Sequence, residues 1–225
     1  MTSRETKEDQ YEDLFDVENE AGRFRMGLMS NQTWYDDPKR LGFQLARYKF
    51  VARMLEGKNS VLEVGCADAF GIRVVQQFVP KVTAIDFDPL FIEDAQARIQ
   101  DRWTLDLRVH DILRGPVEGP FDAAFSLDVL EHIDPADEGT FIKNMAGSIV
   151  QDGIAIIGMP TLESQVHASS QSRRGHVNCK SGNELRETML KSFQNVFIFS
   201  MNDEVVHTGF HAMAHYLFAL CCGVR

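Results

Sequence analysis

Residues 61–71 read VLEVGCADAFG, and the pattern of this stretch indicates the fold class. Val61 to Val64 form a short run of the length of a buried strand, and the run ends at Gly65. The small residues that follow allow the backbone to turn and to approach a ligand closely. A helix is expected next, over 71–79. We therefore expect a strand, a tight turn and a helix in this stretch.

Strands and helices continue to alternate after this unit. Expected strands lie at 61–64, 82–85, 105–109, 121–127 and 154–157, and expected helices at 39–55, 71–79, 89–102 and 136–150. Asp88 followed by Pro89 is a typical helix start. Such alternation indicates a parallel sheet that is covered by helices on both faces.

The C-terminal part follows a different pattern. A helix expected at about 182–192 precedes an apolar run at 195–199, and a last apolar run covers 215–222. The connection between the two runs is too short for a full crossover helix, so we expect a closing antiparallel pair. Residues 34–38, WYDDP, are interpreted as a turn before the first long helix.

A cofactor site is expected where the first two strands end, because ligands of open α/β sheets bind beyond the carboxyl ends of the strands. Asp86 ends the second strand, and a carboxylate there can accept hydrogen bonds from both hydroxyls of a ribose. The dinucleotide pattern G-x-G-x-x-G fails, because Ala67 and Phe70 replace its second and third glycines. A Walker phosphate loop is also absent. A ribose site without a phosphate cradle favours S-adenosylmethionine (SAM).

Four motifs occur in order along the chain, at residues 61–66, 84–88, 110–112 and 121–133. Together they resemble the motifs of the class I SAM-dependent methyltransferases, over about residues 40–160. The resemblance implies an α/β fold that is Rossmann-like and doubly wound. Its mostly parallel seven-stranded sheet would have an antiparallel C-terminal strand and an N-terminal helical lid. Residues 1–38 would form the acidic segment and lid, and 39–225 a single methyltransferase domain.

The resemblance also implies which residues contact SAM and its product S-adenosyl-L-homocysteine (SAH). The set is Tyr35, Glu63, Gly65, Cys66, Ala67, Gly71, Asp86, Phe87, Asp111, Ile112 and Leu127. The first motif would surround the methionine portion, Asp86 would clamp the ribose, and Asp111 and the Ile112 amide would meet the adenine.

Alternatives remain for several of these residues. Glu63 could instead cap the loop, Asp111 could be a turn acid, and Phe87 could be a core residue rather than a ring against adenosine. Tyr35 could be ordinary packing in the lid. The family often has glycine where this chain has Ala67 and Ala69, and alanine resists positive φ. We therefore expect a slightly different path for this loop.

Histidine is suited to taking a proton from a methyl acceptor near neutral pH. His132 follows the fourth strand, His167 and His176 lie in the long connection after the fifth, and His207 follows the sixth. If these strands are parallel, all of these connections open on one face. The four histidines are the catalytic candidates, although His132 is often structural in this fold.

Metal ligands are not assigned. His207, His211 and His215 have the i, i+4, i+8 spacing of one helix face. However, Gly209 interrupts the segment, and a strand is expected to begin at 215.

The formal net charge of −10 and the absence of a basic patch disfavour nucleic acids and anionic membranes as partners. We expect a soluble cytoplasmic enzyme with a small-molecule acceptor, and a homodimer stays open. A protein or peptide methyltransferase and a non-catalytic SAM-binding module are the alternatives. Residues 126–129, SLDV, replace the Asn/Asp-Pro-Pro-Tyr/Phe motif expected of enzymes that methylate exocyclic base amines.

Overall fold

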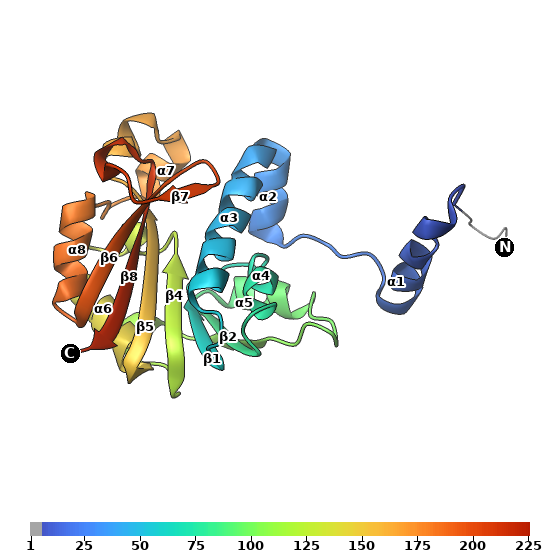
Figure 1. Cartoon of the computed structure of the whole chain (residues 1–225), viewed down its shortest axis with the longest axis horizontal. Helices are drawn as coiled ribbons and strands as arrows, with labels where there is room; N and C mark the ends of the chain where they lie inside the picture. Colours follow the sequence, from blue (N-terminus) through green and yellow to red (C-terminus); the bar gives the residue numbers. More distant parts are fainter. Residues whose placement is uncertain (1–5) are drawn as a thin grey trace.

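The computed structural model describes residues 6–225, and its centre is an eight-stranded sheet with the order β3-β2-β1-β4-β5-β8-β6-β7 (Figure 1). The strands are β1 (Ser60–Val64), β2 (Lys81–Asp86), β3 (Asp106–Val109), β4 (Phe121–Leu127), β5 (Ile149–Pro160), β6 (Phe193–Asn202), β7 (Val205–His207) and β8 (Tyr216–Val224). Strands β1 to β5 are parallel. Because β8 is antiparallel to both β5 and β6, strand β6 runs in the direction of β5.

The fold class expected from the sequence is therefore confirmed, including the antiparallel C-terminal strand. The one additional strand, β7, forms a hairpin with β6 through Asp203 and Glu204. It is only three residues long, so it leaves no apolar run in the sequence.

The five expected helices differ from their expected bounds mainly at their ends, whereas α1, α2 and α7 were not expected. They are α1 (Asp13–Ala21), α2 (Leu28–Asp36), α3 (Pro38–Met54), α4 (Ile72–Gln76), α5 (Pro89–Gln96), α6 (Glu138–Gly147), α7 (Ser170–Gly175) and α8 (Gly182–Leu190). Asp88 caps α5 as expected, since its side chain accepts a hydrogen bond from the Leu90 amide. The turn expected at 34–38 is wrong: Trp34 and Tyr35 belong to α2, and the break falls at Asp37.

Two apolar layers hold the helices to the two faces of the sheet. Helices α6 and α8 pack through residues such as Phe141 and Leu185 against one face, which includes Leu62 of β1. Helices α3, α4 and α5 pack through residues such as Val51 and Ile72 against the other. Since neighbouring residues of a strand point to opposite faces, Glu63 faces the α3 side.

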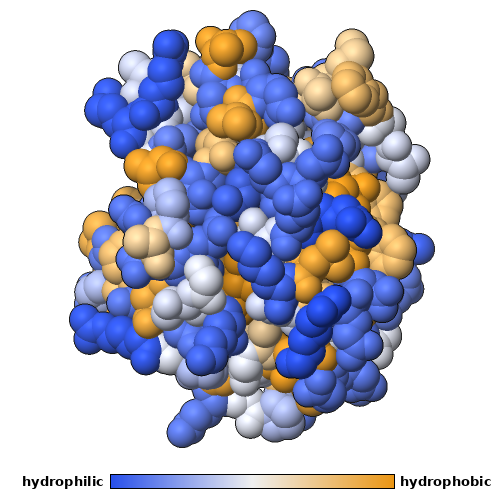
Figure 2. Space-filling model, turned by 90° about the vertical axis from the view of Figure 1, so that its left-hand side faces the viewer, coloured by the Kyte–Doolittle hydropathy of each residue, from blue (hydrophilic) through white to orange (hydrophobic). Residues whose placement is uncertain are grey.

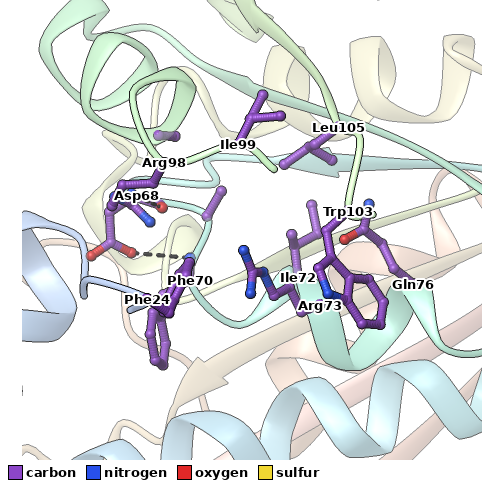
Figure 3. Close-up of a pocket in the computed structure, with 12 residues that line it drawn as sticks. Phe24, Asp68, Phe70, Ile72, Arg73, Gln76, Arg98, Ile99, Trp103 and Leu105 are labelled. Atoms are coloured by element: carbon purple, nitrogen blue, oxygen red, sulfur yellow. Dashed lines mark hydrogen bonds between the residues drawn. The ribbon is translucent and has the colours of Figure 1, made fainter. Parts of the chain in front are cut away.

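The N-terminal segment reaches the domain from outside. Helix α1 stands apart from the sheet and has no buried residue (Figure 1). The chain then crosses the outer side of α4, where the Arg73 guanidinium lies 3.9 Å from the centre of the Phe24 ring. Figure 3 shows Phe24 beside Phe70 at a small cavity, with Arg73 between Phe24 and Trp103. This contact fixes the chain just before α2.

The outer surface at the α8 side is mainly hydrophilic, and its apolar atoms form small separate patches (Figure 2). Within residues 6–225, no helix combines the length and the apolar character that crossing a membrane requires.

Candidate active site

A cavity of about 90 Å³ lies where β1 and β4 end. The loop after β1 forms its floor, and α2 and α3 cover it. The lining residues are Met29, Ser30, Gln44, Arg47, Tyr48, Gly65, Cys66, Ala67, Asp68, Phe70, Gly71, Leu127 and Asp128. Five of the expected cofactor residues, Gly65, Cys66, Ala67, Gly71 and Leu127, are therefore in its wall.

The loop after β1 has an unusual backbone. Gly65 has a φ of +77°, and a Cβ at this position would lie 2.4 Å from Val129 Cγ2. Ala67 and Ala69 also have positive φ, at 46° and 52°. The expectation that alanine would change the loop's path is thus wrong: both alanines adopt the left-handed conformation themselves. Each carries strain that glycine would avoid.

Asp86 binds this loop to the end of β2. Its Oδ2 accepts a hydrogen bond of 2.9 Å from the Ala67 amide, and its Oδ1 accepts one of 3.0 Å from the Asp88 amide. Each carboxylate oxygen keeps a further lone pair, so these bonds orient the group and leave capacity for ribose hydroxyls. The next residue, Phe87, is 74% exposed, which rules out the alternative that it is a core residue.

Glu63 is buried beneath the cavity. Its Oε1 accepts a hydrogen bond of 2.7 Å from the hydroxyl of Tyr48, and its Oε2 has no partner within residues 6–225. Burial raises the pKa of Glu63 to about 8, against the opposing effect of the Tyr48 hydrogen bond. Gly71 is required here, since a Cβ would lie 2.3 Å from the Tyr48 ring. A buried carboxyl with one unpaired oxygen fits the ammonium group of an amino acid.

The remaining expected cofactor residues lie in different settings. Asp111 Oδ1 caps a short 3₁₀ helix, η2 (Ile112–Arg114), by accepting from the Leu113 amide at 3.0 Å. This is the turn role that the sequence left open. Ile112 has a buried side chain. Tyr35 is 86% exposed on α2 and is not in the cavity wall, so the structure does not bring it to the other cofactor residues.

A charged pair that the sequence analysis did not assign lies at the other end of the cavity. Arg47 Nη1 is 2.8 Å and 2.6 Å from the two carboxylate oxygens of Asp128. The Arg47 guanidinium also lies 3.8 Å from the ring centre of Tyr216, whose hydroxyl has no partner within the described residues. Burial alone would lower the pKa of Arg47, but Asp128 and its neighbours hold it above the ordinary value. The position of Asp128, directly after β4, is the sequence signal that could have identified it.

The structure brings together only two of the four candidate catalytic histidines. The rings of His132 and His176 have centres 5.1 Å apart. His167 is exposed at the end of η4 (Glu163–His167). His207 lies on β7, which β5, β8 and β6 separate from β4. The helical spacing of His207, His211 and His215 does not correspond to one helix, because the three lie on β7, on η5 (His211–Met213) and beside β8.

Comparison with known proteins gives a domain match and a fold. A family model described as "Methyltransferase domain" matches residues 61–153. No curated protein sequence is similar enough to match the chain. The N-methyltransferase NodS from Bradyrhizobium japonicum WM9, solved in complex with SAH, has a TM-score of 0.63 and 20% identity, over 93% of this chain and 97% of that chain.

Two further solved structures are similar. A DhpI–SAH complex has a TM-score of 0.62 and 16% identity, over 86% of this chain and 91% of that chain. A SAM-dependent methyltransferase from Clostridium acetobutylicum ATCC 824 has a TM-score of 0.69 and 8% identity, over 87% and 98% of the two chains. At these identities the likeness establishes the fold.

The matched domain contains the loop after β1 and the end of β4, which form one side of the cavity, and it also contains Asp86. The cover over the cavity, from α2 and α3, lies before the matched residues. Residues 61–153 therefore match a methyltransferase domain, and the chain has the fold of SAM-dependent methyltransferases, as its motifs predicted. SAM supplies an electrophilic methyl group on a sulfonium centre when it is bound. The residues fit this cofactor: Glu63 offers an unpaired carboxyl to the amino-acid end, and the Gly65 loop and Asp86 offer a place for the nucleoside. The individual contacts remain predictions.

Proposed function

We propose that this enzyme methylates an oxygen or nitrogen atom of a small molecule. The observation that carries the proposal is the cover over the cavity. Met29 and Ser30 of α2, and Gln44, Arg47 and Tyr48 of α3, close over the loop after β1. A site that two helices cover favours a small acceptor group over a broad acceptor surface. Such a cover also excludes water from the reaction, which favours transfer to the intended acceptor.

The Arg47–Asp128 pair would position the acceptor. The Asp128 side chain is 36% exposed, whereas the Arg47 side chain beside it is only 14% exposed. The carboxylate can therefore accept a hydrogen bond from an acceptor's hydroxyl or amine and receive its proton, while Arg47 holds the carboxylate in place. Methyl transfer depends mainly on such positioning. NodS is an N-methyltransferase, and we extend to this chain only transfer to oxygen or nitrogen.

Labelled-methyl transfer tests this proposal. The purified protein would be incubated with methyl-labelled SAM and with separated metabolite and protein fractions of a cell extract. We expect label in a small product, and we expect Asp128→Asn to lower kcat/KM by roughly 10²-fold while SAM affinity is kept. Asp152→Asn is the control, because Asp152 is exposed near the opposite end of β5. Label found only in the protein fraction would contradict the proposal and favour a protein or peptide acceptor.

A further inference from the structure

Three side chains next to the Arg47–Asp128 pair form a cluster that has no role in the methyl transfer proposed above. One carboxylate oxygen of Glu131 and one ring nitrogen each of His132 and His176 all lie within 4.8 Å of one another. Glu131 is only 1% exposed, and its Oε2 has no hydrogen-bond partner within residues 6–225. A carboxylate oxygen without a partner in such a place is costly unless a cation balances the charge or the group takes up a proton.

Hydrogen bonds determine the tautomers of both histidines. Nδ1 of His132 lies 2.9 Å from the carbonyl oxygen of Gly175, which can only accept, so Nδ1 carries the proton. Nδ1 of His176 lies 2.8 Å from Oε1 of Gln165. The Gln165 amide orientation is itself determined, because its Nε2 donates to the Thr161 carbonyl at 3.0 Å. In both neutral rings Nε2 therefore keeps the lone pair that a metal ion requires, an arrangement typical of metal-binding histidines.

The backbone holds the cluster in place before any ion binds. The amides of Val177 and Asn178 donate hydrogen bonds of 2.8 Å and 3.0 Å to the Glu131 carbonyl oxygen. These bonds tie the segment that carries His176 to the 3₁₀ helix η3 (Leu130–His132). The nearest lysine of this segment, Lys180, is already paired with Glu138 at 2.6 Å. The cation that interacts with Glu131 from α3 is Arg47, which already forms an ion pair with Asp128.

We propose that Glu131, His132 and His176 bind one divalent transition-metal ion. Two imidazoles and one carboxylate suit Zn²⁺, Co²⁺ or Fe²⁺ better than Mg²⁺ or Ca²⁺, which prefer oxygen ligands. Ligand atoms around a tetrahedral ion at about 2.1 Å lie roughly 3.4 Å apart, so the three groups need to move closer by at most about 1.4 Å. Exposed His132 leaves a path by which an ion can enter.

Three protein ligands leave a coordination position open, as in catalytic rather than structural zinc sites. Asp128 lies three residues before Glu131, and the two carboxyl groups are close enough to interact electrostatically. The open position would bind the acceptor's oxygen or nitrogen, and this part of the inference rests on the proposed function.

Cobalt binding tests the site without SAM, acceptor or turnover. The full chain, treated with a chelator and then dialysed, would be titrated with Co²⁺ at slightly alkaline pH and followed by calorimetry and visible absorption. We expect one ion per chain, with the absorption of a low-coordinate N/O site. His132→Ala and Glu131→Gln should each weaken Co²⁺ binding by about tenfold or more. His132 is exposed, so its replacement keeps the fold, which circular dichroism would verify.

His207→Ala is the matched control for metal binding, since it removes a histidine outside the cluster. It should bind Co²⁺ as the unaltered chain does. Absence of the cobalt spectrum in the unaltered chain, or equal affinity in folded His132→Ala and Glu131→Gln, would overturn the proposal. Neither result bears on methyl transfer to a small molecule, so the two proposals fail independently.

Discussion

At the scale of single residues, the loop after β1 carries strain in order to form the cavity floor. Ala67 has a φ of 46°, where an alanine costs about 1–2 kcal/mol relative to its ordinary conformations. Its amide nevertheless binds Asp86, and this bond holds the loop against β2. The strain is thus offset by contacts that build the cofactor site.

Replacing Ala67 with glycine should release this strain. Glycine also loses more conformational freedom on folding, by about 0.5–1 kcal/mol, so we expect the free energy of unfolding to rise by up to about 1.5 kcal/mol. Ala46→Gly in the interior of α3 is the control and should lower it by about 1 kcal/mol. Chemical denaturation of both variants measures the difference. Equal destabilisation by the two substitutions would show that the Ala67 backbone is not strained.

At the scale of elements, α2 depends on a carboxylate of the sheet domain for its N-terminus. Gly27, at the N-cap, has no side chain to cap the helix. Asp68 replaces such a cap: its Oδ2 accepts from the Ser30 amide at 2.7 Å, and its Oδ1 accepts from the Ser30 hydroxyl at 3.2 Å. The cover over the cavity is therefore attached to the loop that forms its floor.

Asp68→Ala should loosen α2 without unfolding the sheet domain. The loss of buried acceptors costs about 1–3 kcal/mol, so amide hydrogen exchange over 28–36 should accelerate by roughly tenfold or more. Asp122→Ala is the control, because Asp122 accepts from the amides of Asn59 and Ser60 near the start of β1. It should leave exchange in α2 unchanged. Unchanged exchange in Asp68→Ala would mean that other contacts hold the cover.

The sequence predicted long, periodic elements well and short or non-periodic ones poorly. The strands up to β5 and the antiparallel β6–β8 pair follow from apolar runs, whereas β7 is too short to leave one. The Gly65 loop and Asp86 were predictable because parallel strands end at one edge. The Arg47–Asp128 pair was not, because it joins residues 81 positions apart through a contact that only packing creates. The proximity of His132 and His176 was not predictable either, because packing also creates this contact.

At the scale of the whole molecule, the two faces of the sheet differ in the polarity of their buried residues. The α6–α8 face is an apolar core. On the α3 side, the titratable carboxyl group of Glu63 lies in the buried layer and accepts a hydrogen bond from Tyr48. Below pH 8 or so the free protein holds a proton on Glu63. An ammonium group beside Glu63 favours the charged carboxylate, so we expect Glu63 to release its proton when the cofactor binds. Above the pKa of Glu63 the free protein has already lost this proton, so binding no longer releases one.

Calorimetry of SAH binding at pH 7, in buffers of different ionisation enthalpy, tests whether the Gly65 loop and Glu63 form a SAM site. We expect SAH to bind with release of close to one proton, and NAD not to bind. Glu63→Gln should bind without proton release. Gly65→Ala should lose affinity, because its Cβ meets Val129, while Gly139→Ala, which has open space around it, should behave as the unaltered chain. Binding of NAD with no affinity for SAH or SAM would contradict the account.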